Sequence, residues 1–212
     1  QENYALFTPP GYGQDETHAD MEQIAGRAAD FSARTGHPLH WPVFPGAPDR
    51  LGRILMGLGL KREDDHIAMR AFLGDPIPAP AGAPKISGPL RDENAVRRWA
   101  EYAWRGFDSG EMPPEPFVTF ALNMARRPEI SLVCAPGAAG MLCAAEGSAG
   151  IYYVATVPEY RGRGLGGAVV EALKAAARGM GFGTVTLLAT PRGHPLYLRH
   201  GFRDTGAVQI YS

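Results

Sequence analysis

The sequence predicts a mixed α/β (α+β) fold in which helices flank a mixed, mostly antiparallel sheet. Three observations predict it. Strand-type and helix-type segments alternate along the chain, a cysteine-containing hairpin lies beyond its middle, and a glycine-rich turn joins a strand to a helix near the C-terminal quarter. Elements that each carry one apolar face bury it by stacking into layers, so this alternation predicts a sheet covered by helices.

The first 84 residues predict four elements: a helix at 17–34, a strand at 38–43, a helix at 48–56 and a strand at 66–72. This order repeats the second half of the downstream region, so we interpret residues 1–84 as a degenerate half-repeat. A proline-rich linker at 75–84 ends it, because its four prolines support neither a helix nor a central strand.

Beyond the linker, the sequence predicts a short strand at 85–87 and two helices. The first helix spans about 92–107 and starts at Asp92, a residue type that caps helix N-termini. Residues at near-helical spacing form its apolar side: Val96, Trp99, Ala103 and Phe107. The second helix follows Pro113 and Pro114 and continues through Met124.

A β-hairpin is predicted from the apolar runs 131–135 and 141–146, which flank the turn sequence 136–140. If residues 137–140 form the loop, the chain's two cysteines, Cys134 and Cys143, become cross-strand neighbours. A disulfide across directly paired strands is strained, and a cytoplasmic setting disfavours it. We therefore expect two reduced thiols.

The last part predicts a strand at 151–157, a helix ending near 179, a strand at 184–190, a short helix at 195–200 and final strands at 202–205 and 208–211. The helix before 179 has a clear apolar stripe. Its sheet-facing residues are Leu165, Val169, Leu173 and Ala176, whereas Glu171, Lys174 and Arg178 are expected in solvent.

The most informative segment is 154–167, which reads VATVPEYRGRGLGG. The first turn of a helix has unpaired N–H groups and the positive end of the helix dipole, so a phosphate placed there gains charge-assisted hydrogen bonds. Gly162, Gly164 and Gly166 remove side chains that would hold a ligand away. Arg161 and Arg163 add positive charge, and arginine grips phosphate groups bidentately. The segment therefore predicts an anion-binding turn.

This turn has two alternative interpretations. One is an ordinary loop-to-helix junction. The other is a dinucleotide fingerprint, since Gly162, Gly164 and Gly167 satisfy G-x-G-x-x-G. Residues 157–161 separate the strand from the first glycine, however, and no acidic residue between Glu171 and Asp204 is present to hold a ribose. A nucleotide-dependent oxidoreductase is therefore disfavoured, and a Walker loop fails because no Lys-Ser/Thr pair follows the glycines.

The spacing Arg161-x-x-Gly164-x-Gly166 resembles the acyl-CoA signature of the general N-acetyltransferase (GNAT) superfamily. Tyr197-x-x-x-Gly201-Phe202 is similar to the segment that members of this family carry on their last helix and the strand after it. The resemblance covers roughly 85–212, which it identifies as a GNAT domain. It implies the GNAT fold, with 1–84 as an N-terminal GNAT-like half-domain.

The resemblance also implies a function: acetyl-CoA-dependent N-acetyl transfer to a primary amine by direct attack. The strand backbone at Val154 and Thr156 is expected to pair with the pantetheine arm. The turn residues Arg161, Gly162, Arg163, Gly164, Leu165 and Gly166 are expected to bind the diphosphate. Tyr197 matches the family's general acid, and the ordinary pKa of a tyrosine keeps it protonated at neutral pH.

Three matters are left open by the residues. Glu146, at the end of the hairpin, is either the general base or a solvated turn carboxylate, and Tyr152, His194 and His200 are weaker candidates. In this family the turn at 104–111 borders the acceptor pocket. Its Asp108 and Glu111 either attract a cation, which Trp104 or Phe107 would stack upon, or belong to an ordinary capped loop. The alternative function is a non-catalytic acyl-CoA sensor or scaffold.

Composition limits the partners. The net charge of −1 gives no basic field for nucleic acid or an anionic membrane, and the apolar runs fall short of the roughly 18–20 residues of a membrane span. We expect a cytoplasmic protein whose acceptor is a small-molecule or protein amine. No His/Cys/Asp/Glu group has metal-ligand spacing, so no metal is expected. Edge strands near the C-terminus are compatible with a homodimer.

Overall fold

The computed structural model describes residues 3–4, 18–35, 39–44, 47, 50–63, 65–74, 82, 84–145 and 147–212. The chain forms two compact units. The first contains Gln1–Ala68, Ala189–Arg192 and Thr205–Ser212, and the second contains Met69–Leu188 and Gly193–Asp204. Among the helices that the structure describes, none combines the length and apolar character that crossing a bilayer requires.

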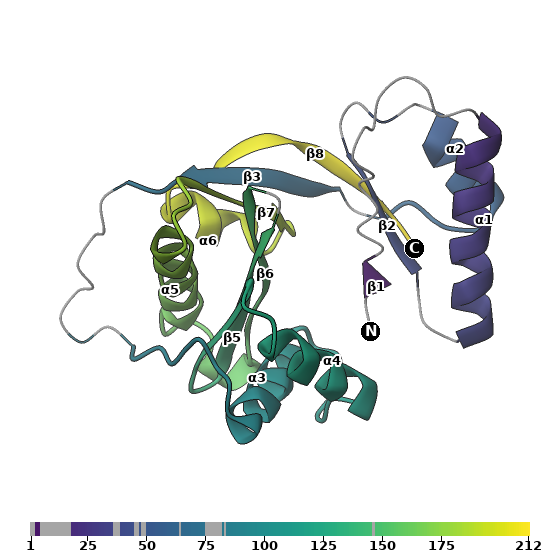
Figure 1. Cartoon of the computed structure of the whole chain (residues 1–212). Helices are drawn as coiled ribbons and strands as arrows, with labels where there is room; N and C mark the ends of the chain where they lie inside the picture. The colour runs from purple at the N-terminus through teal and green to yellow at the C-terminus, as the bar shows by residue number, and fades with distance from the viewer. Residues whose placement is uncertain are drawn as a thin grey trace. The chain divides into compact units, whose positions relative to one another are not determined.

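The second unit is a sheet between two layers of helices (Figure 1). Its strand order is β3-β7-β6-β5-β4. The strands are β3 (His66–Phe72), β4 (Ile130–Ala135), β5 (Ala138–Ala145), β6 (Ser148–Thr156) and β7 (Thr184–Ala189). The helices are α3 (Glu93–Gly106), α4 (Glu115–Ala125), the 3-10 turn η1 (Pro158–Tyr160), α5 (Leu165–Gly179) and α6 (His194–Arg199). Helices α3 and α4 pack on one face of the sheet, and α5 packs on the other.

The first unit contains β1 (Asn3–Tyr4), α1 (His18–Thr35), β2 (Leu39–Val43), α2 (Arg50–Gly57) and most of β8 (Arg203–Tyr211). Strand β2 pairs parallel with β1 and antiparallel with β8, where Trp41 opposes Tyr211. The four predicted elements of this half are confirmed, within a residue or two at their ends. Most of the linker at 75–84 lies outside the described residues, and the half-repeat stays a prediction.

The first helix of the second unit begins as predicted. The Asp92 carboxylate accepts a hydrogen bond from the N–H of Ala95 at 2.9 Å and caps α3. Val96, Trp99 and Ala103 are fully buried against the sheet. Phe107, in contrast, is 45% exposed. It is the C-cap residue of α3, so it no longer follows the helical stripe and its predicted place in the core is wrong.

The predicted register of the cysteine hairpin is also wrong. Cys134 opposes Ala139, and Cys143 opposes Ile130. The chain reverses in only two residues because Gly137 adopts the left-handed conformation at φ 81°, and β5 already begins at Ala138. The cysteines are free thiols, as expected. Both pack against the α3–α4 core, and burial raises the pKa of each thiol.

Four smaller expectations also fail. Lys174 is buried rather than solvated, because its Nζ donates to Glu171 Oε1 at 2.9 Å and to the carbonyl of His200 at 3.0 Å. Ala176 is only half-buried, and Ala177 takes its place against the sheet. The strand at 85–87 reduces to one bridge between Ser87 and Cys134, and the two final strands are the continuous β8.

Candidate functional site

Strand β6 separates from its parallel neighbour immediately before the glycine turn. It pairs with β5 along most of its length but with β7 only at Gly150, which opposes Thr186. From Ile151 to Thr156 this edge of β6 has no strand partner within the described part of the second unit. Exposed strand edges bind extended, amide-containing chains by main-chain hydrogen bonds. The edge therefore provides a place for such a ligand.

A β-bulge shapes the same strand. The β5–β6 register shifts between Ala139 and Met141, and Tyr153 adopts φ 53°, a left-handed conformation that costs a tyrosine about 1 kcal/mol or more. An aromatic cluster holds it. The Tyr153 ring lies 5.7–6.2 Å, centroid to centroid, from four rings: Trp99, Phe107, Phe117 and Phe120. Sequence reasoning included Tyr153 in the strand but missed the bulge, in which Tyr153 and Val154 of β6 oppose the single residue Gly140 of β5.

Two glycines of the turn adopt left-handed backbone conformations. Gly162 and Gly164 have φ values of 76° and 75°, and a Cβ on either would point into open space. Gly164 is the N-cap of α5, and no acidic residue lies in the first turn. The first N–H groups of the helix have no intrahelical acceptors, and a glycine cap provides no side chain for them. The main-chain N–H groups and the open space beside the two glycines are suited to an anion, and we call this feature the anion cradle.

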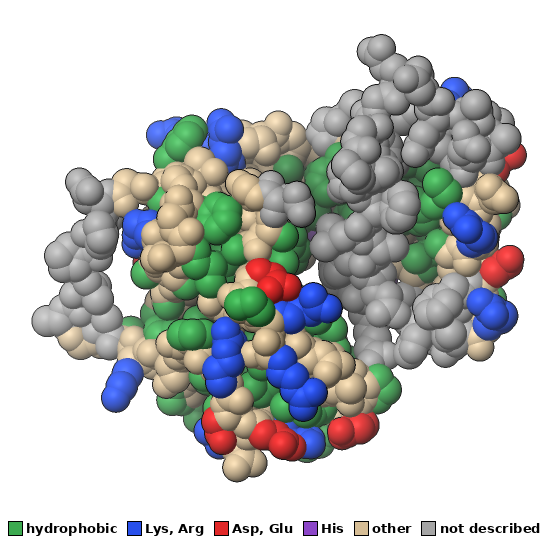
Figure 2. Space-filling model, in the orientation of Figure 1, with side chains coloured by type: hydrophobic (Ala, Val, Ile, Leu, Met, Phe, Trp, Pro, Cys, Tyr) green, Lys and Arg blue, Asp and Glu red, His purple; other side chains and the backbone are tan. Residues whose placement is uncertain are grey.

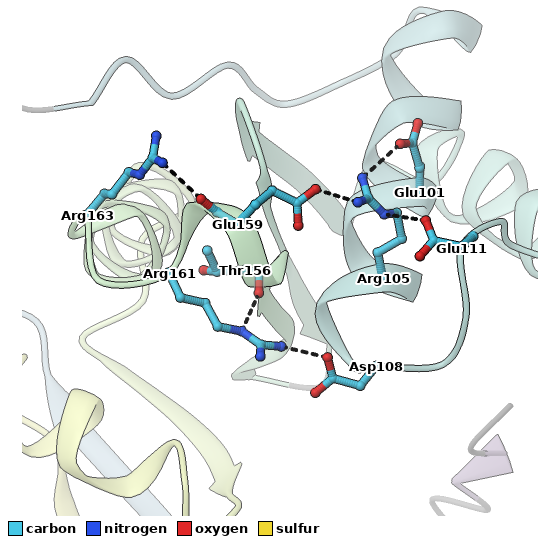
Figure 3. A network of polar contacts seen from close by, with 8 residues as sticks. All are labelled: Glu101, Arg105, Asp108, Glu111, Thr156, Glu159, Arg161 and Arg163. Atoms are coloured by element: carbon cyan, nitrogen blue, oxygen red, sulfur yellow. Dashed lines mark hydrogen bonds and ion pairs between the residues drawn. The ribbon is translucent and has the colours of Figure 1, made fainter.

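The two arginines of the turn point to different partners (Figure 3). Arg161 Nε donates to the Thr156 carbonyl at 3.0 Å, and its Nη2 donates to Asp108 Oδ1 at 2.9 Å and to the Gly106 carbonyl at 3.1 Å. Arg163 Nη2 donates to the Glu159 carbonyl at 2.9 Å, and its guanidinium lies 5.1 Å from the centre of the Tyr160 ring. Phosphate contacts from Arg161 and Arg163 stay a prediction.

Tyr197 lies on α6 and is 8% exposed. Its ring packs edge-on against Phe202, with the centroids 5.7 Å apart. Burial raises the pKa of the Tyr197 hydroxyl from 10 to about 12. The hydroxyl therefore stays protonated at every pH at which such a protein works, which is what a proton donor requires.

The candidate bases have different surroundings. Glu146 lies outside the described residues, so its role stays a prediction. Burial raises the pKa of the Tyr152 hydroxyl, which keeps it protonated at neutral pH. His194 Nε2 lies 2.8 Å from Asp204 Oδ1, and His200 Nδ1 lies 2.8 Å from Glu171 Oε1. Both histidines are thus paired with carboxylates.

Gly167 has a packing role. A Cβ on Gly167 would lie 2.5 Å from His200 Nε2, so this glycine lets α6 approach α5. At Gly166 the nearest atoms to such a Cβ, on Leu196 and Thr156, lie at ordinary contact distances of 3.4–3.5 Å. Ligand access therefore explains Gly166 better than Gly167.

The loop expected to border the acceptor has its acidic side chains in ion pairs. Asp108 pairs with Arg161, and Glu111 Oε2 lies 3.6 Å from Arg105 Nε. The Trp104 ring packs on Phe117 at 5.4 Å, within the core. Of the four residues considered for cation recognition, only Phe107 offers an exposed ring beside β6, where it meets Tyr153 at 6.2 Å.

The separating strand edge, the bulge and the glycine cradle all lie within the second unit, an α/β domain. The sequence model of the acetyltransferase (GNAT) domain matches residues 128–204, which include the glycine turn and Tyr197. This part of the chain therefore matches the GNAT domain, and the resemblance inferred from the two motifs is confirmed. No match was found among curated proteins.

Solved structures share the fold. A GCN5-related N-acetyltransferase from Kribbella flavida superposes with a TM-score of 0.60 at 18% identity, covering 91% of this chain and 75% of that one. A GCN5-related N-acetyltransferase from Sphaerobacter thermophilus has a TM-score of 0.60 at 19% identity, covering 82% of this chain and 58% of that one. A tandem GNAT protein from the clavulanic acid biosynthesis pathway has a TM-score of 0.56 at 18% identity, covering 94% of this chain and 70% of that one. The predicted fold class is confirmed.

Proposed function

We propose that the chain is an acetyl-CoA-dependent N-acetyltransferase that moves an acetyl group to a primary amine of a small molecule or protein. One observation carries the proposal. Strand β6 loses its β7 partner after Gly150 and leads, through the short turn η1, into a main-chain anion cradle at the start of α5. A ligand with amide groups at one end and a diphosphate at the other matches this edge and cradle.

The proposed cosubstrate contacts follow from the strand geometry. The N–H of Val157 donates to the Gly137 carbonyl at 2.9 Å, so the N–H and carbonyl of the preceding residue, Thr156, point away from β5. Its carbonyl accepts from Arg161, which leaves the N–H of Thr156 directed to the open edge. We assign pantetheine contacts to Val154 and Thr156, and diphosphate contacts to the main-chain N–H groups of 162–166, including Leu165, with charge from Arg163.

The proposed reaction is a direct displacement. The neutral amine attacks the thioester carbonyl carbon, a C–N bond forms, the C–S bond breaks, and the amine proton passes to a base for which Glu146 is the candidate. Tyr197 donates a proton to the departing thiolate. A main-chain N–H on the open edge of β6 is suited to stabilise the oxyanion, since fixed donors in a water-poor site act strongly on developing charge.

The test incubates the protein with acetyl-CoA and a panel of amino acids, an aminoglycoside, a polyamine and a lysine-containing peptide, and follows release of free thiol. Amine-dependent release, with an acetylated product in the mass spectrum, supports the proposal. Gly164→Val should abolish it, because valine is strained at φ 75° and its side chain fills the cradle. Gly179→Ala, at the far end of the same helix with open space around it, is the control.

Three results would count against parts of the proposal. Calorimetric binding of acetyl-CoA without turnover of any amine favours a sensor or scaffold. Absence of binding at millimolar acetyl-CoA rejects both functions. Ping-pong kinetics with a transferable acetyl-enzyme contradicts direct attack.

A further inference from the structure

We propose that Arg161 is a positioning residue: its guanidinium holds the α3–α4 loop (107–114) against the end of β6, and it is not a direct ligand of the diphosphate. The functional meaning of this assignment rests on the proposed acetyl transfer. The assignment itself rests on contacts between three segments of the second unit: the C-terminal end of α3 with its loop, the end of β6, and the glycine turn.

Two arginines join these segments in opposite directions (Figure 3). Arg161, on the turn, reaches across to Asp108 at 2.9 Å and to the Gly106 carbonyl at 3.1 Å. Arg105, on α3, reaches back to Glu159, which belongs to η1. Each pair joins residues more than fifty positions apart in the chain. Two ion pairs therefore join the end of α3 and its loop to the segment formed by η1 and the glycine turn, and each side supplies one cation and one carboxylate.

The backbone contact beneath these ion pairs is equally close. A Cβ on Gly106 would lie 2.7 Å from the Cβ of Ala155 and 2.9 Å from the main-chain nitrogen of Thr156. The end of α3 therefore rests directly on the last residues of β6, and only a glycine permits it. Asp108, two residues after Gly106, adopts a left-handed backbone conformation with φ 56°, which is uncommon for a residue with a side chain.

The Nε and Nη2 donors of Arg161 are already bonded to protein acceptors. Nε serves the Thr156 carbonyl while Nη2 serves the loop, so the planar fork spans β6 and the loop at once. A bidentate grip on a phosphate would require these bonds to break. Lysine, with a single ammonium, cannot span both acceptor groups in the same way.

The surrounding charge points to the same assignment. Arg105 Nη1 lies 3.5 Å from Glu101 Oε1, and its Nε lies 3.6 Å from Glu111 Oε2. Arg105 also pairs with Glu159, so several carboxylates lie on this side of the turn. Basic and acidic side chains are interspersed on the face of the unit shown in Figure 2. A diphosphate close to Arg161 would approach Asp108 as well. The main chain of 162–166 and Arg163 are better placed to receive it.

The consequence for the reaction is geometric. The strand that holds the thioester and the loop that borders the acceptor become one rigid part when Arg161 joins them. Transfer between two bound groups depends steeply on their separation and angle, so a loop fixed to β6 fixes the amine relative to the carbonyl carbon.

The test measures hydrogen–deuterium exchange of the loop and CoA affinity in the same variants. Loop amides are well suited, because Asp108 N–H donates to the Arg105 carbonyl and Ser109 N–H to the Trp104 carbonyl. Arg161→Gln and Asp108→Asn should each speed exchange at 107–110 at least tenfold, and the double variant should add little. Exchange in β5 should stay unchanged, and CoA Kd by calorimetry should change less than threefold. Arg161→Lys should recover part of the loop protection.

Arg97→Gln is the matched control, since Arg97 pairs with Glu93 and Glu115 on the same helix layer but not with the turn. Unchanged loop exchange in Arg161→Gln overturns the proposal. If CoA binding weakens tenfold or more in Arg161→Gln, the CoA affinity of Asp108→Asn distinguishes the two explanations. An equal loss of affinity in Asp108→Asn supports action of Arg161 through the loop. Unchanged affinity in Asp108→Asn shows a direct contact between Arg161 and phosphate and overturns the proposal. If the wild type does not bind CoA, the proposed function fails. The exchange data still test whether Arg161 holds the α3–α4 loop against β6.

Discussion

Single residues show how burial adapts an ordinary side chain to a task. The Tyr197 phenol is enclosed beside Phe202, and its pKa of about 12 is the result of burial alone. Lys174 is enclosed as well, but it stays compatible with the interior because Glu171 and the His200 carbonyl accept its hydrogen bonds. The pKa of Glu171 is lowered chiefly by its bond to His200. This small cluster ties α6, which carries Tyr197, to α5.

We predict that Tyr197→Phe makes stability less sensitive to alkaline pH. The folded pKa lies above the unfolded value near 10, so the contribution is fully present below pH 10 and is lost as pH rises toward 12. Relative to Tyr197→Phe, the wild type should lose about 1.4 kcal/mol of unfolding free energy by pH about 11. Denaturant titrations of both proteins from pH about 8 to about 11 measure this. Parallel curves across that range would mean that the phenol is not buried.

The local motifs of the site were predictable from the sequence, whereas the destinations of its side chains were not. The glycine turn and the helix after it depend on residues within one short segment, so their pattern was sufficient. Two partners of Arg161, Gly106 and Asp108, lie more than fifty positions away. The His200 carbonyl that accepts from Lys174 lies at the C-cap of α6, so no local period contains these contacts. Tyr153 escaped notice for the same reason, since its conformation is held by rings from α3, the loop after it and α4.

Among whole elements, the β4–β5 hairpin shows why register is hard to predict. The segment 136–140 contains two glycines, and either can reverse the chain. The structure uses Gly137 for the turn, whereas Gly140 stays within β5, opposite the bulge of β6. This choice depends on α5, whose Val169 and Leu173 side chains occupy the space beside Gly140. It also depends on Trp99, whose Nε1 donates to the Gly140 carbonyl at 2.9 Å.

We predict that Gly140→Ala destabilises the protein by about 1–3 kcal/mol, as overpacking of a core typically does. The new Cβ would lie 2.5 Å from Val169 Cγ1 and 2.9 Å from Leu173 Cδ1, which forces α5 away from the sheet. Gly179→Ala, on the same helix with nothing within 4 Å, should be neutral or stabilising by up to about 1 kcal/mol. Chemical unfolding of the two variants compares them. Equal stabilities would show that the helix-to-sheet contact at Gly140 is loose.

At the scale of the whole molecule, the elements of the proposed acetyl-CoA site belong to the second unit. Strand β6, the glycine turn and Tyr197 all lie within Met69–Leu188 and Gly193–Asp204. The first unit has its own core, centred on Trp41, Leu51 and Leu55. Because a ligand stabilises only the structure that binds it, the two units should respond differently to acetyl-CoA.

We predict that acetyl-CoA at a hundredfold excess over its Kd stabilises the second unit by about 2.7 kcal/mol. For a chain of this size that corresponds to a rise in Tm of roughly 5–11 °C in calorimetry. NADPH carries a diphosphate but no pantetheine amides for the open edge of β6, so its effect should be much smaller. Arg163→Gln should reduce the rise, because it removes charge beside the cradle. An equal rise with NADPH would mean that the cradle acts alone and that the strand edge contributes nothing to recognition.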